Sequence, residues 1–391
     1  MSMYFIGIDI SKYKHDCCII SAANQKVVSK VIIKNNKAGF NELLTIIHSL
    51  ANPADIRIGF ESTAHYALNL ELFLENSLLT FMEVNPVLIS EYKKSKTLRR
   101  TKTDSVDCES IARWLMTVEY KPHSKGFYHA YSLKSLTRLR DRLIRQRSFY
   151  LVKITNVLDH TFPEFKPFFN ERLSKTALYL LENYGSAEKM ARMNSASYDK
   201  LRCISRGKFS IQQFLRLKEL AANTVGVNNS IFDLELNTLL TLYKSLSDEI
   251  NTLETEIIKL IEEVHPHYMS IPGIGPISSA VIYAEYGDIS NFSNPGQMLA
   301  FAGIEPGIND SGTESHGGRM VKHGSSQLRY VLLNACLPLI RFDLTFATYY
   351  EKKRAEGKKH RVAITHVAKK LIRVIYALER QDVDFNAQKL R

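Results

Sequence analysis

Three short apolar, β-branched runs open this chain, with too little room between them for a helix. They cover residues 4–10, 16–22 and 27–34 and are separated by polar or turn residues, which predicts three strands, most simply a meander. Helical apolar spacing follows at 38–50. Strand and helix patterns then alternate over 56–61, 64–76, 78–84 and 86–94. Three strands followed by alternating helices and strands predict a mixed α/β sheet with helices packed on it.

Four carboxylates fall at informative places in this pattern. Asp9 lies within the first predicted strand, which we expect to be central, and Glu61 ends the fourth, which we expect beside it. Asp104 and Asp107 are three residues apart on a predicted helix and therefore share a face. Clustered carboxylates repel one another unless a cation lies among them, and they suit Mg²⁺ or Mn²⁺. This arrangement predicts a metal site for phosphoryl displacement, although Asp104 alone is equally compatible with a helix cap.

The remainder of the chain has few strand signals. Residues 132–265 have helical spacing, and the stretch 231–264 favours a coiled coil or an antiparallel helical arm. After Pro266, helices are expected near 276–286, 295–302, 325–341, 344–356 and 361–380, interrupted by a glycine-rich loop at 303–324. We therefore predict three domains, with boundaries at 1–160, 161–265 and 266–391.

The charge balance points to a polyanionic partner. Lysine and arginine number 52 against 40 acidic residues, which gives a net charge of +12. Such an excess favours phosphate backbones or anionic membranes. No apolar stretch reaches the ~18–20 residues that span a bilayer, and no signal peptide is evident. The five cysteines form no zinc or CxxC spacing, so we expect buried, reduced thiols in a cytoplasmic protein.

Basic side chains gather in three runs, one of them directly before Asp104. A charge run is commonly a solvated face, but three runs favour contacts with a nucleic-acid backbone. The segment IPGIGPIS is similar to a helix-hairpin-helix turn, whose amides can approach a phosphate. The candidate nucleic-acid contacts are Lys93, Lys94, Lys96, Arg99, Arg100, Lys102, Gly273, Gly275, Arg319, Lys322, Lys352, Lys353 and Arg354.

The glycine-rich segment GIEPGINDSGTESHGGR carries Ser311, which is followed by a glycine. A serine hydroxyl is a weak nucleophile that needs a base or a metal ion. From the residues alone, an ordinary turn serine is the simpler interpretation. Ser315, Ser325 and Ser326 are the competing candidates.

Long motifs occur in a fixed order along the chain. They are GIDISKYKHDCCII, FESTAHY, NPVLISEYKKSKTLRRTKTDSVDCESIARW, SIPGIGPISSAVIYAEYGDISNFSNPGQMLAFAGIEPGINDSG and KHGSSQLRYVLLNAC. Together they resemble the DEDD-type insertion-sequence transposases with a catalytic serine. These are the bridge-RNA-guided recombinases, which are related to the Piv-type invertases. The resemblance covers nearly the whole chain and is weakest over 160–260. It implies an RNase H-like (RuvC-like) α/β domain, a helical or coiled-coil arm and an all-α C-terminal transposase domain.

The resemblance also implies a function. The family excises and integrates insertion sequences, with Asp9, Glu61, Asp104 and Asp107 binding Mg²⁺ or Mn²⁺ and Ser311 attacking a DNA phosphate. The family's serine motif is P-x(3)-SG, whereas four residues separate Pro306 from Ser311 here. The implied partners are double-stranded donor and target DNA, a structured non-coding guide RNA and further copies of the chain, in a dimer or tetramer whose catalytic halves come from different protomers. No membrane is implied, and we expect a cytoplasmic, nucleoid-associated protein of a bacterium or archaeon.

Three alternatives remain open. A metal-dependent, structure-specific endonuclease of the Holliday-junction-resolvase kind would use water as its nucleophile, and Ser311 would be dispensable. A non-enzymatic nucleic-acid-binding protein is disfavoured because it has no use for Asp9 and Glu61 at strand ends. A tyrosine recombinase could use late residues such as Arg329, His360, Arg361 and Tyr349, but no convincing His-x-x-Arg box is present.

Overall fold

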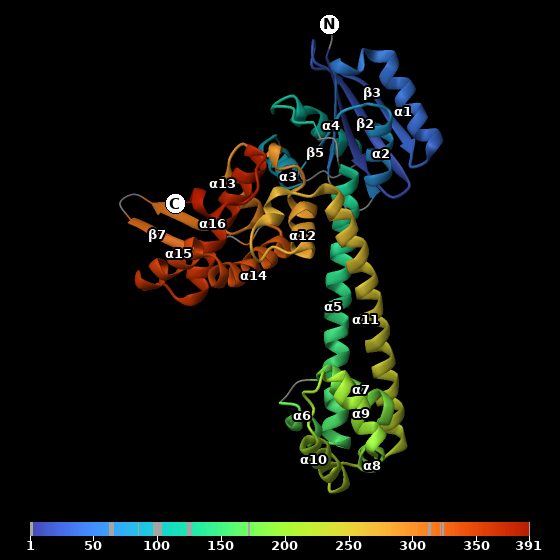
Figure 1. The fold of residues 1–391 in the computed structure, drawn as a ribbon. Coiled ribbons are helices and arrows are strands. Elements are labelled where there is room, and N and C mark those ends of the chain that lie inside the picture. Colours follow the sequence, from blue (N-terminus) through green and yellow to red (C-terminus); the bar gives the residue numbers. More distant parts are fainter. Residues whose placement is uncertain are drawn as a thin grey trace. The chain divides into compact units, whose positions relative to one another are not determined.

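The chain forms two compact units, residues 1–128 and 129–391, in a computed structural model (Figure 1). The structure describes residues 3–61, 66–84, 86–96, 104–122, 127–170, 173–311, 314–320, 322 and 324–390. The predicted α/β fold followed by helical regions is confirmed. The three domain boundaries drawn from the sequence stay predictions.

A five-stranded mixed sheet organises the first unit. Its strands are β1 (Tyr4–Ile10), β2 (Lys14–Ser21), β3 (Val27–Lys34), β4 (Ile56–Glu61) and β5 (Phe81–Val84). The spatial order is β3-β2-β1-β4-β5, with antiparallel pairing from β3 to β1 and parallel pairing from β1 to β5. The expected meander and the central place of the first strand are therefore confirmed.

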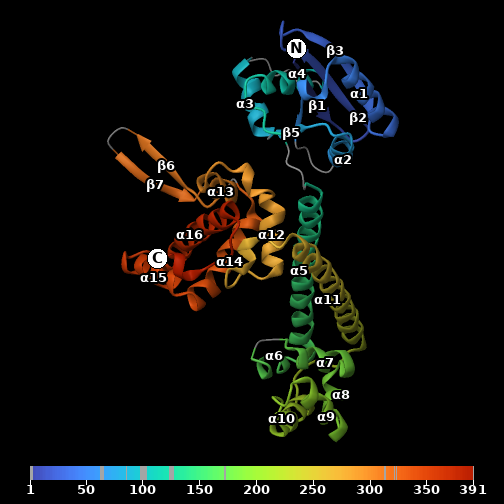
Figure 2. The same ribbon diagram turned by 45° about the horizontal axis from the view of Figure 1, so that its top comes forward.

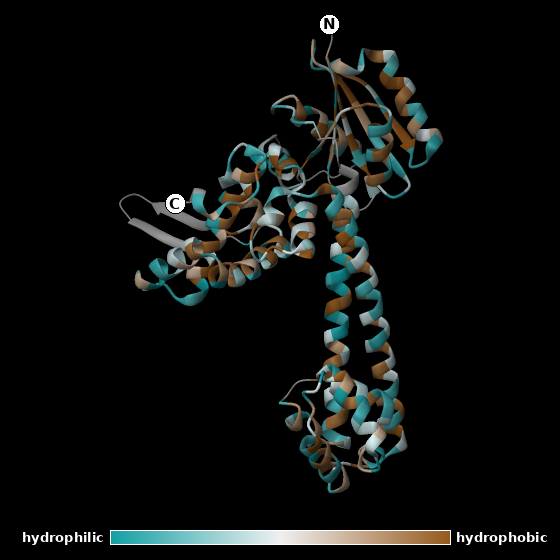
Figure 3. Ribbon diagram, in the orientation of Figure 1, coloured by the Kyte–Doolittle hydropathy of each residue, from teal (hydrophilic) through white to brown (hydrophobic). Residues whose placement is uncertain are grey.

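Strand alternation divides the first unit into two layers of core. Ile6 and Ile8 of β1 and Phe60 of β4 face helices α1 (Lys37–Leu50) and α2 (Leu68–Asn76). Phe5 faces the other side, together with α3 (Pro86–Lys96) and α4 (Asp104–Leu115). Both faces of the sheet are covered, and Figure 3 accordingly shows the central strands largely in the brown of apolar residues.

The core of this unit includes the chain's one tryptophan. Trp114 is buried against Ile89 and Ile111, which confirms the expected packing role. Four of the five cysteines are buried free thiols, as predicted, but Cys203 is exposed. The expectation was wrong there because Cys203 lies near the end of a short helix, α9 (Ser195–Ile204), on its outer side.

Two long helices pair in the second unit. They are α5 (Phe127–Thr161) and α11 (Ser230–Val264), each of 35 residues. Leu133, near the start of α5, packs against Ile257 and Ile261, whereas Ile154, near its end, shares a core with Leu236. The helices are therefore antiparallel, and Figure 2 shows them running side by side. The predicted antiparallel arm is confirmed, and knobs-into-holes packing stays a prediction.

Local signals end and join these helices. Asn229 caps the start of α11 by accepting from the Ile231 amide. His265 ends it in the left-handed region at φ 45°, and Pro266 follows. Between the long helices lie five short ones around a shared apolar core that includes Phe165, Leu180 and Leu217. They are α6 (Phe165–Phe168), α7 (Lys175–Tyr184), α8 (Ala187–Ala191), α9 and α10 (Ile211–Ala222).

The C-terminal part is helical apart from one hairpin. Its helices are α12 (Pro276–Tyr286), α13 (Pro295–Ala302), α14 (Ser326–Phe342), α15 (Leu344–Ala355) and α16 (His360–Gln381), close to the predicted bounds. The glycine-rich loop expected at 303–324 instead contains antiparallel strands β6 (Pro306–Ser311) and β7 (Glu314–Met320). The loop prediction was wrong because backbone pairing needs no apolar side chains.

No single described helix is both long and apolar enough to cross a membrane. By length and composition only, the α14 and α15 pair, bent by 105°, meets that test together.

One buried acid pair makes the stability of the first unit depend on pH. Glu71 of α2 is buried and hydrogen bonds Glu83 of β5, and burial, followed by the charge of Glu83, raises the pKa of Glu71 from 4.5 to about 9. The folded state therefore keeps a proton that the unfolded state releases above pH 4.5. This contribution to stability is complete below pH 4.5 and is lost as the pH rises toward 9.

We predict that Glu71→Gln flattens this pH dependence because glutamine stays neutral. The wild type should lose up to about 1.4 kcal/mol of unfolding free energy per pH unit from this group between pH 5 and 8. Urea titrations followed by Trp114 fluorescence report on this unit. Glu75→Gln on the same helix is the control and should keep the wild-type dependence of unfolding free energy on pH. If Glu71→Gln also keeps that dependence, Glu71 does not hold a proton in the folded state.

Candidate active site

Helix α4 lies unusually close to the sheet because two glycines face it. A Cβ atom at Gly7 would lie 2.2 Å from the Cys108 carbonyl oxygen and 2.4 Å from the Ala112 amide nitrogen. At Gly59, the neighbouring position on β4, a Cβ would lie 2.7 Å from Leu115 Cδ1. Gly7 faces backbone atoms of α4, so glycine is required there for this approach, whereas the Leu115 side chain could adjust to a Cβ at Gly59. The approach brings the acidic residues of α4 close to the strands.

The predicted acids continue this face of the sheet. Asp9 and Glu61 are each two residues beyond one of these glycines, and they directly follow the aligned pair Ile8 and Phe60. Side chains alternate along a strand, so both carboxylates point to the α4 side. The structure thus places Asp9, Glu61 and Asp107 on the same side of the sheet, with Asp107 on the first turn of α4.

A lysine lies between two of these acids. Lys93 of α3 places its Nζ 2.9 Å from Asp107 Oδ1 and 3.9 Å from Glu61 Oε1. The two carboxylates are largely shielded from solvent, with side-chain exposures of 14% and 16%. An ammonium group shared by two shielded carboxylates shows that both acids converge on one cation. Sequence reasoning had assigned Lys93 to nucleic-acid contact instead.

Asp16 is a further acid that sequence reasoning missed. It is directly opposite Asp9 in the antiparallel pair of β1 and β2, so both side chains lie on one face. Asp16 is buried and forms an ion pair with Lys14 Nζ at 3.2 Å. Asp16 lies next to Asp9 only because of the register between β1 and β2, and this register could not be deduced from the sequence.

The donor set suits a hard divalent ion. Asp104 begins α4, but its side chain lies outside the described residues. Among the described side chains, no three histidines, cysteines or acids are grouped so that they could hold a metal ion. Glu61 and Asp107, however, already share the Lys93 cation, and carboxylate oxygens are the ligands that Mg²⁺ and Mn²⁺ prefer. The chemistry of the donors therefore fits a divalent metal.

Ser311 belongs to the second unit and ends strand β6. Its backbone pairs with Glu314, the first residue of β7, which puts Ser311 beside the turn of the hairpin. Its side chain, and residues 312 and 313, lie outside the described part of the chain. The competing candidate Ser325 has a structural role, since its Oγ accepts from the Leu328 amide and caps α14.

The basic candidates differ in their surroundings. Lys94 and Lys322 are exposed. Lys353 forms an ion pair with Glu356 at 2.8 Å, and Arg354 donates to the Lys358 carbonyl oxygen. Arg99, Arg100, Lys102 and the side chains of Lys96 and Arg319 lie outside the described residues.

Arginines on α5 also make internal ion pairs. Arg138 binds Glu285 of α12 through two hydrogen bonds of 3.1 and 3.2 Å, and Arg140 binds Glu254 of α11 at 2.7 Å. These two arginines therefore hold helices of the second unit together.

The two glycines of the helix-hairpin-helix-like turn have different environments. Gly273 has a φ of +92°, and a Cβ there would meet Pro338 Cγ at 2.7 Å, so packing against α14 explains this glycine. Gly275 precedes α12, and a Cβ there would meet no atom within 4 Å. A phosphate contact remains a prediction for both, and Gly275 offers the more open approach.

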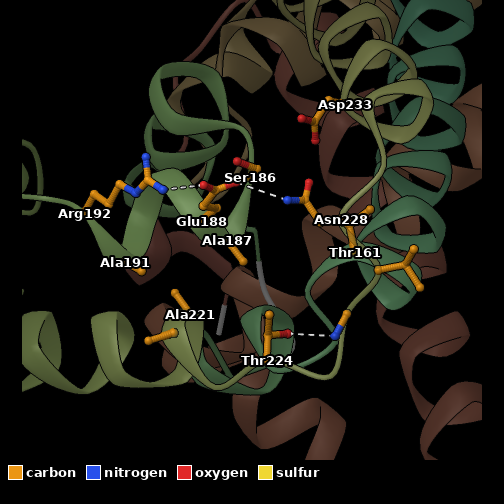
Figure 4. Close-up of a pocket in the computed structure, with 13 residues that line it drawn as sticks. Thr161, Ser186, Ala187, Glu188, Ala191, Arg192, Ala221, Thr224, Asn228 and Asp233 are labelled. Atoms are coloured by element: carbon orange, nitrogen blue, oxygen red, sulfur yellow. Dashed lines mark hydrogen bonds and ion pairs between the residues drawn. The ribbon is translucent and has the colours of Figure 1, made fainter.

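A separate cavity of about 320 Å³ lies among the short helices of the second unit (Figure 4). Its polar groups bond one another: Glu188 accepts from Arg192 and from Asn228 at 2.5 and 3.1 Å, and Thr224 accepts from the Gly226 amide. The cavity contains none of the predicted catalytic residues.

Two family models match this chain. Residues 6–163 match the DEDD transposase model for IS110, described as "Transposase", and residues 266–351 match the model described as "Transposase IS116/IS110/IS902 family". The chain belongs to the IS110 family of DEDD transposases. The first match spans Asp9, Glu61 and Asp107, and the second spans the β6–β7 hairpin.

Individual relatives of this transposase extend over its whole length. A 42 kDa protein of insertion element IS900 from Mycobacterium paratuberculosis is 26% identical, covering 96% of this chain and 95% of the relative. A 43.6 kDa protein of insertion element IS110 from Streptomyces coelicolor is 24% identical, covering 98% and 96%. A pilin gene-inverting protein of Moraxella bovis is 24% identical, covering 99% and 98%. The chain is a DNA recombinase of the transposase class.

We predict that Gly7→Ala displaces α4 and destabilises the first unit by about 1–3 kcal/mol, because the new methyl group would overlap backbone atoms of α4, which cannot rotate out of the way as a side chain can. The urea midpoint measured by Trp114 fluorescence should fall accordingly. Ser110→Ala is the control, since that hydroxyl donates to a carbonyl oxygen of its own helix. An unchanged midpoint for Gly7→Ala would show that α4 has room to move.

Proposed function

We propose that this transposase excises and integrates its insertion sequence by attack of the Ser311 hydroxyl on a DNA phosphate held at the acidic cluster. The observation that carries the proposal is the convergence of Glu61 and Asp107 on one cation beside Asp9, within the DEDD transposase match. A carboxylate cluster with this geometry serves phosphoryl transfer better than it serves simple binding, because carboxylates repel a phosphate unless a metal ion joins them.

The proposed metal ligands are Asp9, Glu61, Asp104 and Asp107. A Mg²⁺ or Mn²⁺ ion bound there would stabilise negative charge on the phosphate oxygens. These ligands would position the reacting phosphate, since Asp9 and Glu61 lie at strand ends and Asp107 on the first turn of the helix that packs on Gly7.

Ser311 supplies the proposed nucleophile. Its Oγ–P bond forms as a sugar oxygen–P bond of the DNA breaks; the hydroxyl proton passes to a base, and the departing sugar oxygen takes up a proton. The covalent link conserves the energy of the broken phosphodiester, so rejoining to a new strand needs no further energy source. The position of Ser311 at the end of β6, within the segment matched by the second transposase model, supports this role.

We propose that the complete site is assembled from two protomers, in a dimer or tetramer. The acidic cluster belongs to the first compact unit and Ser311 to the second. Specificity for donor and target DNA would come from base pairing with a structured guide RNA. The protein's +12 charge would serve sequence-independent contacts with both nucleic acids.

We predict that Asp9→Asn abolishes strand cleavage but leaves nucleic-acid binding nearly intact, and that Ser311→Ala loses the covalent adduct. A nicked suicide substrate should trap wild-type protein, and mass spectrometry should place the adduct on the Ser311 peptide. Mixing the two inactive variants should restore part of the activity if each protomer contributes half a site.

Two outcomes would contradict this mechanism. Cleavage by Ser311→Ala without an adduct would favour a hydrolytic nuclease that uses water. An adduct on a tyrosine such as Tyr349 would favour a tyrosine recombinase. Ser325→Ala is the matched serine control and should keep the adduct, since its hydroxyl caps a helix.

We also predict a graded loss of DNA affinity when Lys352, Lys353 and Arg354 are replaced by methionine. Binding should weaken for DNA of any sequence. A plot of log affinity against log salt concentration should become less steep, by up to about 0.9 in slope for each lost phosphate contact. The single Lys352 change should account for most of the effect, because Lys353 and Arg354 have internal partners. An unchanged slope would identify this run as a solvated face.

A further inference from the structure

The Lys93 ammonium group lies where the acidic cluster would hold its metal ion. Its Nζ is 2.9 Å from Asp107 and 3.9 Å from Glu61, and both are proposed metal ligands. The lysine side chain is 30% exposed, about twice as much as either carboxylate, so it enters the cluster from the solvent side.

Packing fixes the helix face that carries Lys93. Ile89 lies one turn earlier on α3, is fully buried and packs with Ile111 and Trp114 of α4. Residues four apart share a helix face, so Lys93 is aimed at α4 by the same contact. Its neighbour Lys94 is exposed and belongs to another face of α3.

We propose that Lys93 is an internal substitute for the divalent cation. It holds Glu61 and Asp107 together in the metal-free protein, and its ammonium must leave Asp107 before a divalent ion binds. Two positive groups cannot share the same carboxylate oxygens at these distances without strong repulsion. The lysine stem is long and flexible, so the ammonium can move away without displacing α3. The inference rests on the proposed metal role of the cluster.

Lys93 therefore has two opposing effects in this proposal. Without metal, it neutralises repulsion between the acids and stabilises the first unit. With metal, it competes, so metal affinity is lower than four carboxylates alone would give. Lys93 is thus a positioning residue that keeps the ligands assembled and the ion exchangeable.

Removal of the charge tests both effects on the full chain. We expect Lys93→Met to bind Mn²⁺ at least tenfold more tightly in isothermal titration calorimetry. The same variant should melt at a lower temperature without metal and gain more than wild type when Mn²⁺ is added. Lys93→Arg keeps the charge and should bind Mn²⁺ as weakly as wild type. Lys94→Met is the matched control and should have the wild-type Mn²⁺ affinity and melting temperature.

The outcomes separate this inference from the proposed function. If wild type binds Mn²⁺, Asp107→Asn abolishes binding and Lys93→Met leaves the affinity unchanged or weaker, the role of Lys93 is wrong while the metal site stands. If neither wild type nor Lys93→Met binds Mn²⁺ at the cluster, both the inference and the proposed metal centre fail. Melting curves of Lys93→Arg show whether an effect of Lys93→Met comes from lost charge or from misfolding.

Discussion

The approach of α4 to the central strands is the constraint on which the acidic cluster depends. The Cys108 carbonyl oxygen and the Ala112 amide occupy space that any side chain at Gly7 would need, and Leu115 fills the same role over Gly59. With α4 seated this closely, its first turn comes to the strand ends that carry Asp9 and Glu61. A larger residue at Gly7 would move the helix and separate acids that belong to different elements, whereas a small residue at Gly59 could be accommodated by rotation of the Leu115 side chain. The geometry of the site therefore depends on the lack of a side chain at Gly7.

The chain's positive charge is partly used to hold its own acids. Lys14 pairs with Asp16, Lys30 with Glu109 and Lys93 with Asp107, all in the first unit. In the second unit, Arg138 binds Glu285, which is almost fully buried. The net charge of +12 remains, but the phosphate-binding surface must be drawn from other lysines and arginines. A count of lysines and arginines in the sequence is therefore larger than the number of side chains that are available to contact DNA phosphates.

The fold could be predicted further than the site. The apolar, β-branched runs predicted the meander and the central β1, because strands that are buried on both faces of a sheet carry nearly continuous apolar side chains. The hairpin at β6 and β7 was missed because its residues are polar and glycine-rich, so they carry none of the apolar signal from which the other strands were predicted. The position of Asp16 beside Asp9 could not be predicted, because it depends on the register between β1 and β2. Lys93 could have been separated from its basic neighbours only by noticing that it lies one turn after the buried Ile89.

The antiparallel pairing of α5 and α11 makes everything between them a closed excursion of the chain. Leu133, near the start of α5, and Ile257, near the end of α11, belong to the same apolar cluster as Ala280 and Ala284 of α12. The arm therefore begins and ends at the same place, beside the C-terminal helices. A helix of 35 residues is about 52 Å long, so the excursion is extensive. Equal lengths could be deleted from both helices, or added to them, without moving the residues at their base. Evolution can thus vary the reach of this arm independently of the catalytic machinery, which agrees with a family resemblance that is weakest there.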